Sequence, residues 1–190
     1  MKKLLFLSVL LLALTSCIET KKGDGEAEKD SLAIADRQTI EVGIVGDGTS
    51  MHSLEFVSQS GDTLYIVYEN NAVGGLACGD LISVEYSEGD EELNAQYIVN
   101  LTALCNSWVA SDKYGNSYLT LDKNGGASYV GSDFPYKKWT ICDGCLYLTK
   151  DETTDKFDIV LLTEDSLLLK MDEEESVIPF AKTDHVPVFK

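Results

Sequence analysis

From Thr39 onward, apolar and polar residues alternate in short runs, and Gly and Asp interrupt these runs about every eight to twelve residues. Leu64, Ile66 and Tyr68 show the period of two. A strand places every second side chain on one face, whereas a helix repeats about every 3.6 residues. The pattern therefore predicts an all-β chain with no helix longer than a turn or two after the N-terminal region.

The first half of this region predicts five strands. They are Thr39–Val45, the run around Leu54 and Phe56, Leu64–Tyr68, Ile82–Tyr86, and the run from Ala95 to Leu101. A longer loop, Asn70–Cys78, follows the third strand. Five strands in about 66 residues fit a small barrel of the OB type, and a sandwich of that size fits the pattern nearly as well. We assign residues 39–104 to this OB-like domain.

A second set of strands begins near Trp108 and defines a lipocalin-like domain over residues 105–190. Its strands are Tyr118–Leu121, Ala127–Val130, Tyr136–Cys142, Cys145–Thr149, Phe157–Leu161, Leu167–Met171 and Val177–Phe180. Pro179 cannot donate a backbone hydrogen bond, which favours an edge position for the last strand. The chain is thus expected to form two small antiparallel barrel-like domains.

Asp143-Gly144 gives the clearest hairpin signal in the sequence. Both residues tolerate the positive φ that a type I′ turn requires. The pairs that follow from this turn are Cys142 with Cys145, Ile141 with Leu146, and Trp139 with Leu148. The four large apolar residues then share one face, so we expect both cysteines to point away from the core toward solvent.

Cys78, Cys105, Cys142 and Cys145 follow Cys17 in the chain. An exported protein can oxidise such thiols. A Cys142–Cys145 disulfide would fit a hairpin pair, and a Cys78–Cys105 bond is the alternative. The hairpin pair could instead bind a soft metal such as Cu(I) or zinc, or remain as idle thiols.

The N-terminus predicts export. Lys2 and Lys3 precede an apolar run, Leu4–Leu14, that is too short to span a bilayer. Leu14-Thr-Ser-Cys17 resembles the lipobox of bacterial lipoproteins, which implies a signal peptide at 1–16 and acylation of Cys17. Residues 17–38, rich in Lys, Glu, Asp and Gly, read as a flexible tether. We expect an outer-membrane protein, and the sequence does not decide between the periplasmic and the surface leaflet.

Several segments resemble small two-domain lipoproteins of Bacteroidetes, a largely uncharacterised family. The segments are Asp47–Met51, Gly61–Leu64, Gly79–Tyr86, Leu119–Ala127, Tyr136–Trp139, Gly144–Leu148 and Asp165–Leu169. The resemblance implies an OB-like domain followed by a lipocalin-like one, and it transfers no catalytic residue. Asp30-Ser31-Leu32 also resembles the O-glycosylation sequon of Bacteroidetes, which makes Ser31 in the tether a candidate acceptor.

Charge and motif content exclude several functions. Without Lys2 and Lys3, 13 basic side chains face 32 acidic ones, a net charge of about −19. Nucleic acid is therefore an unsuitable partner. His52 and His185 lie far apart in sequence, and Ser128 misses the nucleophile-elbow spacing. We expect no enzymatic activity and no cofactor.

We interpret the acidic run Asp172–Glu175 as a solvated loop. We interpret the segment Asp122-Lys-Asn-Gly125 as a β-turn. Calcium binding at either is the weaker interpretation, because no glutamate follows Asp122 at calcium-loop spacing.

The expected function is a non-enzymatic, lipid-anchored envelope protein that acts as a binding or interaction module. Its partner would be a small apolar ligand or another envelope protein. An eight-stranded barrel is just wide enough for its own side chains to fill. Seven residues are expected to fill it: Trp139, Ile141, Leu146, Leu148, Phe157, Ile159 and Leu161. The filled barrel is the favoured reading over a cavity. A metal- or redox-responsive sensor built on Cys142 and Cys145 is the alternative function.

Overall fold

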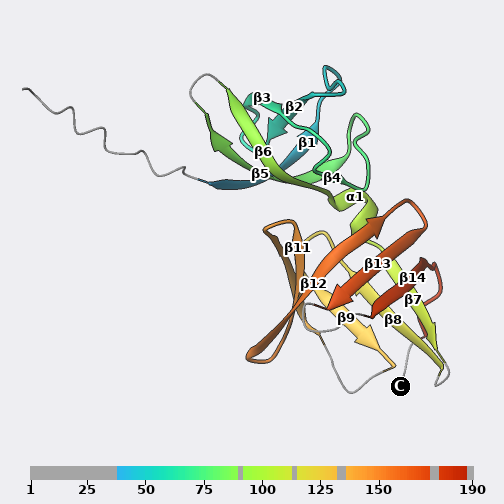
Figure 1. Cartoon of the computed structure of the whole chain (residues 1–190). Coiled ribbons are helices and arrows are strands. Elements are labelled where there is room, and N and C mark those ends of the chain that lie inside the picture. The colour runs from blue at the N-terminus through green and yellow to red at the C-terminus, as the bar shows by residue number, and fades with distance from the viewer. Residues whose placement is uncertain (1–37, 90–91, 113–114, 132–135, 172–175, 188–190) are drawn as a thin grey trace, which may run out of the picture. The chain divides into compact units, whose positions relative to one another are not determined.

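A computed structural model describes residues 38–89, 92–112, 115–131, 136–171 and 176–187 (Figure 1). The expected signal peptide, Cys17, Ser31 and the acidic run Asp172–Glu175 lie outside these residues, as does the tether up to residue 37. Within them the chain is all-β, as the alternation predicts. The described part of the chain contains no helix with the length and apolar character needed to cross a bilayer.

The first sheet consists of β1 (Thr39–Val45), β2 (Ser53–Ser58), β3 (Thr63–Val67), β4 (Ala72–Val73), β5 (Leu81–Glu88) and β6 (Leu93–Asn100). Antiparallel pairs run in the order β3-β2-β1-β5-β6, and a parallel pairing of β3 with β6 closes the ring. This closure makes the sheet an OB-like five-stranded barrel and excludes the sandwich. β4 lies within the expected Asn70–Cys78 loop and pairs with β6.

The core of the first barrel forms where the period of two predicts it in β2, β3 and β5. Its fully buried side chains include those of Leu54, Phe56, Ile66, Ile82, Val84 and Ile98. In β6 the predicted face, Ala95, Tyr97 and Val99, is wrong, because Ile98 enters this core while Val99 belongs to the second core and Tyr97 is 42% exposed. One boundary prediction was wrong: Leu101 does not extend the fifth strand but begins α1 (Leu101–Leu104). Asn100 caps this helix because its Oδ1 accepts a hydrogen bond from Ala103 N at 3.0 Å.

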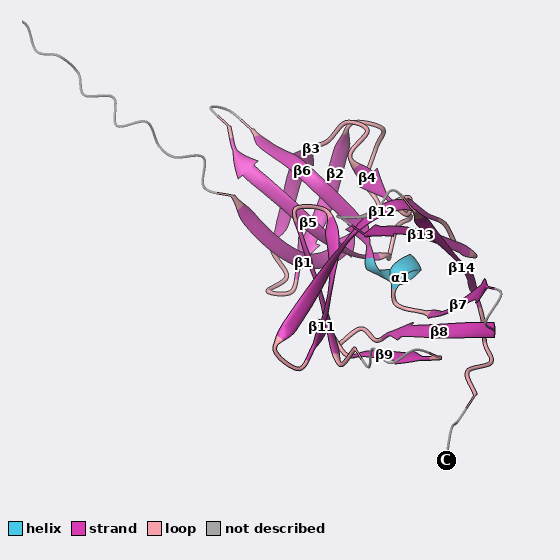
Figure 2. Cartoon of the chain, turned by 60° about the horizontal axis from the view of Figure 1, so that its bottom comes forward, coloured by secondary structure: helices cyan, strands magenta, loops and turns pink. Residues whose placement is uncertain are grey.

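The second sheet is an eight-stranded meander that follows α1 (Figure 2). Its strands are β7 (Ser107–Asp112), β8 (Gly115–Leu121), β9 (Ala127–Val130), β10 (Lys138–Cys142), β11 (Cys145–Lys150), β12 (Thr153–Leu162), β13 (Ser166–Met171) and β14 (Val177–Lys182). β14 pairs with β7, and the join between β9 and β10 rests on a bridge between Gly126 and Lys138. The barrel is therefore nearly closed.

The edge position expected for the last strand is wrong. β14 pairs with β13 on one side, where Pro179 lies opposite Leu168, and with β7 on the other. The ladder to β7 involves Ala181 and Lys182, beyond the proline. Pro179 is tolerated because this ladder does not require its missing N–H.

A bulge in β12 overturns the expected inward position of Leu161. The register with β13 passes from Ile159 opposite Leu169 to Leu161 opposite Leu168, which leaves Val160 as the extra residue. The side chains after an inserted residue exchange faces. Leu161 is consequently 42% exposed, whereas Leu162 is buried at 5%.

The two barrels share packing through β5 and α1. Ile82, Val84 and Tyr86 of β5 face the first core, yet Ser83 and Glu85 on the opposite face are also buried. Val99 of β6, together with Leu101 and Leu104 of α1, belongs to the core of the second barrel. The described residues form one compact unit accordingly.

Candidate functional site

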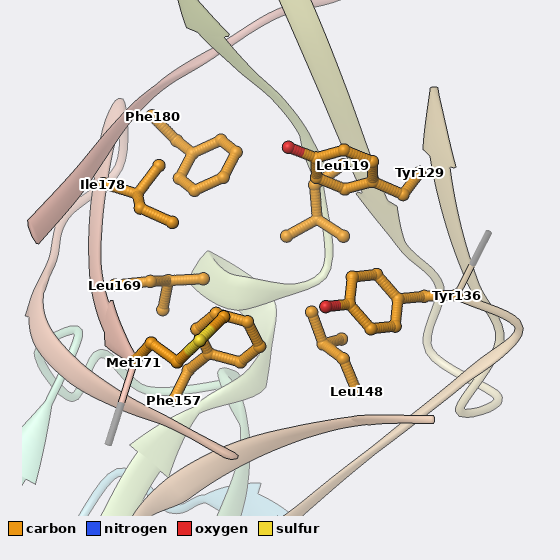
Figure 3. A pocket seen from close by; sticks show the side chains of 9 residues that line it. All are labelled: Leu119, Tyr129, Tyr136, Leu148, Phe157, Leu169, Met171, Ile178 and Phe180. Atoms are coloured by element: carbon orange, nitrogen blue, oxygen red, sulfur yellow. The ribbon is translucent and has the colours of Figure 1, made fainter. Parts of the chain in front are cut away.

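The second barrel contains an apolar pocket of about 180 Å³ (Figure 3). Aliphatic side chains line it from four strands: Leu119, Leu148, Leu169, Met171 and Ile178. Four aromatic side chains complete the wall: Tyr129, Tyr136, Phe157 and Phe180. Every lining residue belongs to the second barrel. An apolar cavity of about 150 Å³ is large enough to bind benzene, so this pocket can hold one small ring.

The filled barrel expected from the sequence is therefore wrong in part. Leu148 and Phe157 are core residues as predicted, but they form the wall of a space that they do not fill. The bulge in β12 also places Leu161 outside the barrel and Leu162 in its core. Hydrophobic periodicity identifies which residues point inward and carries no measure of the volume left between them.

Aromatic rings pack edge to face along one side of the pocket. The Tyr129 and Tyr136 ring centroids are 5.8 Å apart with an interplanar angle of 88°, and those of Tyr136 and Phe157 are 6.5 Å apart at 85°. Such T-shaped pairs are a preferred arrangement of aromatic side chains. The wall is therefore held by its own packing.

The two tyrosine hydroxyls of the pocket differ in their partners. Tyr136 donates to Asp155 Oδ2 at 2.7 Å, and Lys150 Nζ contacts the same oxygen at 3.2 Å. Burial, with the carboxylate of Asp155, raises the pKa of Tyr136 above its usual value, so its hydroxyl stays protonated. The Tyr129 hydroxyl has no hydrogen-bond partner among the described residues. It is the polar group that the pocket leaves available.

The hairpin between β10 and β11 has the predicted register. Cys142 lies opposite Cys145, Ile141 opposite Leu146, and Trp139 opposite Leu148. Asp143 and Gly144 have φ values of 50° and 67°, as a type I′ turn requires. Both cysteines lie outside the two cores, as predicted, but each is half-buried instead of fully exposed.

The turn is covered because it contacts the first barrel. Asp143 N donates to Glu85 Oε2 at 2.9 Å, and Gln38 Nε2 donates to the other oxygen of that carboxylate. A Cβ at Gly144 would lie 2.5 Å from the ring of Tyr97. Glycine at this position thus serves both the turn conformation and the close approach of β6.

Cys142 and Cys145 are free cysteines in this structure, and their environment favours the protonated thiol over the thiolate. Burial raises the pKa of Cys145 to about 11, and its thiol donates to Asp158 Oδ1 at 3.4 Å. Burial and the carboxylate of Asp143 also raise the pKa of Cys142. Thiolate is the nucleophile and the metal ligand, so this setting disfavours redox exchange and metal binding. The disulfide itself stays a prediction.

The second predicted pair, Cys78 and Cys105, differs in exposure. Cys78 lies exposed in the loop after β4, whereas Cys105 is half-buried against the second core. Burial raises the pKa of Cys105 to about 11.

Glu85 gives a pH-dependent prediction, because it is a carboxyl group only 3% exposed. Burial raises its pKa above the ordinary value of 4.5. The folded protein then binds this proton more tightly than the unfolded chain, so stability falls as the pH rises from about 4.5 through the folded pKa. Glu85→Gln keeps an acceptor for Asp143 N–H and removes the titration. We expect chemical denaturation to show a flatter pH dependence for this variant.

Glu88→Gln is the matched control, since Glu88 is an exposed carboxyl group on the same strand. It should leave the pH dependence unchanged. If Glu85→Gln and the unaltered protein lose stability in parallel between pH 4 and pH 7, the burial of Glu85 has no such effect.

The remaining candidates from the sequence have ordinary structural positions. Ser128 is exposed in β9 opposite Thr120, and His52 and His185 are exposed outside the strands. Asp122 Oδ1 accepts from Asn124 N and Gly126 N, which makes its segment a turn. Among the described residues, no group of three or more His, Cys, Asp and Glu side chains could hold a metal ion.

Comparison with known proteins found no matching family model, curated protein or solved structure.

Proposed function

We propose that this chain is a non-enzymatic, lipid-anchored protein of the cell envelope whose second barrel binds a small apolar molecule. The observation that carries the binding role is the pocket of about 180 Å³, walled by aliphatic and aromatic side chains. Binding sites for small molecules are concave and mostly apolar, with a few polar groups that orient the ligand. Tyr129 supplies such a group.

The sequence of the N-terminus supports the anchor. A short apolar run ends at Leu-Thr-Ser-Cys17, and an acidic tether follows. A net charge near −19 would repel anionic lipid headgroups, so attachment would depend on acyl chains. The first barrel would then link the tether to the binding domain, because it packs against the second core through Val99 and Val42.

Changing Cys17 to Ala tests the anchor. The variant should move from the membrane fraction to the soluble fraction, because no acceptor thiol for acylation would remain near the N-terminus. Cell fractionation followed by immunoblotting measures the change, and Cys78→Ala serves as the control that should stay with the membrane. Continued membrane association of the Cys17 variant would show that another feature holds the protein there.

Filling the pocket tests the binding role. Ile178→Phe enlarges a lining side chain on β14, whereas Val177→Phe enlarges its neighbour, which is 41% exposed and does not line the pocket. Native mass spectrometry of protein purified from its own host should detect a bound small molecule in the unaltered chain and in Val177→Phe. The molecule should be absent from Ile178→Phe. Its absence from all three proteins would contradict the proposal.

The alternative, a metal- or redox-responsive sensor, has one favourable observation, the pairing of Cys142 with Cys145. The raised pKa of both thiols weighs against it, because each thiolate would have to form beside nearby carboxylates. Stoichiometric Cu(I) or zinc in the purified protein, lost in Cys142→Ser, would favour the sensor.

A further inference from the structure

The size of the pocket restricts its ligand more tightly than the lipocalin-like fold does. A volume of about 180 Å³ is slightly above the roughly 150 Å³ that accommodates benzene, and below the roughly 300–1,000 Å³ of sites for drug-sized ligands. A single six-membered ring with one small substituent fits this space. A medium or long acyl chain would extend beyond it.

The charge of the wall restricts the ligand further. All nine lining side chains are uncharged. The ion pair beside Tyr136, Lys150 with Asp155, is already engaged in its own contact at 3.2 Å and in the hydrogen bond from Tyr136. An ionised ligand would lose its hydration without gaining a counter-charge, which is unfavourable in an apolar site. The pocket therefore selects against carboxylates and ammonium groups.

The position of Tyr129 adds a directional requirement. Figure 3 shows its ring extending from β9 across the pocket, with the hydroxyl directed toward Phe180. The neighbouring hydroxyl of Tyr136 is committed to Asp155, whereas that of Tyr129 has no partner among the described residues. A ligand that offers one hydrogen-bonding atom can form a hydrogen bond with this hydroxyl.

The aromatic side of the pocket favours a ring over a compact alkane. Tyr129, Tyr136 and Phe157 present ring edges and faces in successive T-shaped contacts. A planar ligand can continue this arrangement, and each aromatic pair contributes more than its buried area alone. Met171 adds a flexible thioether that can pack against a ring.

We infer that the pocket takes a neutral, single-ring aromatic molecule that bears one hydrogen-bonding group, held by the Tyr129 hydroxyl. This inference rests on the proposed binding function and specifies its ligand class. The para-substituted phenol p-cresol is a suitable probe because toluene is the same molecule without the hydroxyl. Benzoate and decanoate represent the charged ring and the acyl chain.

Isothermal titration of the full chain with these four probes tests the inference. The chain should bind p-cresol about three- to tenfold more tightly than toluene, the affinity ratio that one hydrogen bond provides. Tyr129→Phe should bring the p-cresol affinity down to that of toluene and leave toluene binding unchanged. Benzoate and decanoate should show no binding at concentrations that saturate the pocket with p-cresol.

Tyr118→Phe is the matched control, because it removes a hydroxyl from the adjacent strand β8 that does not line the pocket. It should leave the affinity for p-cresol unchanged. Thermal melting of both tyrosine variants establishes that they fold. Ile178→Phe should abolish the binding of p-cresol and toluene together.

The outcomes separate the two proposals. Equal affinity for p-cresol and toluene, or a Tyr129→Phe variant that binds p-cresol normally, would overturn the role of Tyr129. Tighter binding of decanoate or benzoate that Ile178→Phe abolishes would retain the binding function and overturn the ligand class. If no probe binds and native mass spectrometry finds no ligand, the binding function itself fails.

Discussion

Replacing Trp108 with alanine should lower the free energy of unfolding by about 3–5 kcal/mol, the usual cost of removing a buried Trp side chain. Trp108 has no exposed surface, and its Nε1 donates to Leu104 O at 3.0 Å. It packs in the second core beside Leu101 and Leu104 of α1, where the two barrels meet. The substitution would therefore create a cavity at the junction.

Guanidinium denaturation followed by circular dichroism measures this loss. Trp108→Phe should cost less, because it keeps most of the apolar volume, and Leu104 O retains its hydrogen bond from Asn106 N at 2.8 Å. Tyr65→Ala is the surface control: Tyr65 is 63% exposed, so its change should stay within about 0.5 kcal/mol. Equal losses for Trp108→Ala and Tyr65→Ala would contradict the packing described for the junction.

Two adjacent leucines in β12 should respond very differently to truncation. Leu162→Ala is expected to cost about 2–5 kcal/mol, because Leu162 is buried at 5% and packs against Gly74 of the first barrel. Leu161→Ala should cost less than about 1 kcal/mol, since its side chain is 42% exposed. The same denaturation experiment compares them.

This pair also tests the bulge between Ile159 and Leu161. Uninterrupted alternation would bury Leu161 with Phe157 and Ile159 and expose Leu162. A larger loss of stability for Leu161→Ala than for Leu162→Ala would therefore indicate a regular strand and contradict the bulge.

The candidate site was only partly predictable. Leu148 and Phe157 were expected inside the second barrel, and both line the pocket. The sequence assigned no binding role to Tyr129 and Tyr136. Their position on either side of the segment between β9 and β10 could have indicated an aromatic wall. The contact of the Asp143-Gly144 turn with Glu85 joins residues 58 positions apart in the chain, and no local pattern indicates it.

Local alternation and turn chemistry were enough to specify the all-β class, most strands and the register of the Cys142–Cys145 hairpin. These features depend on residues close in sequence, where a period of two and a positive φ at Gly144 act directly. The closure of each sheet, the bulge before Leu161 and the double-sided burial of β5 depend on contacts between distant segments. The pocket depends on them most, because its volume is the space left after all those contacts have formed.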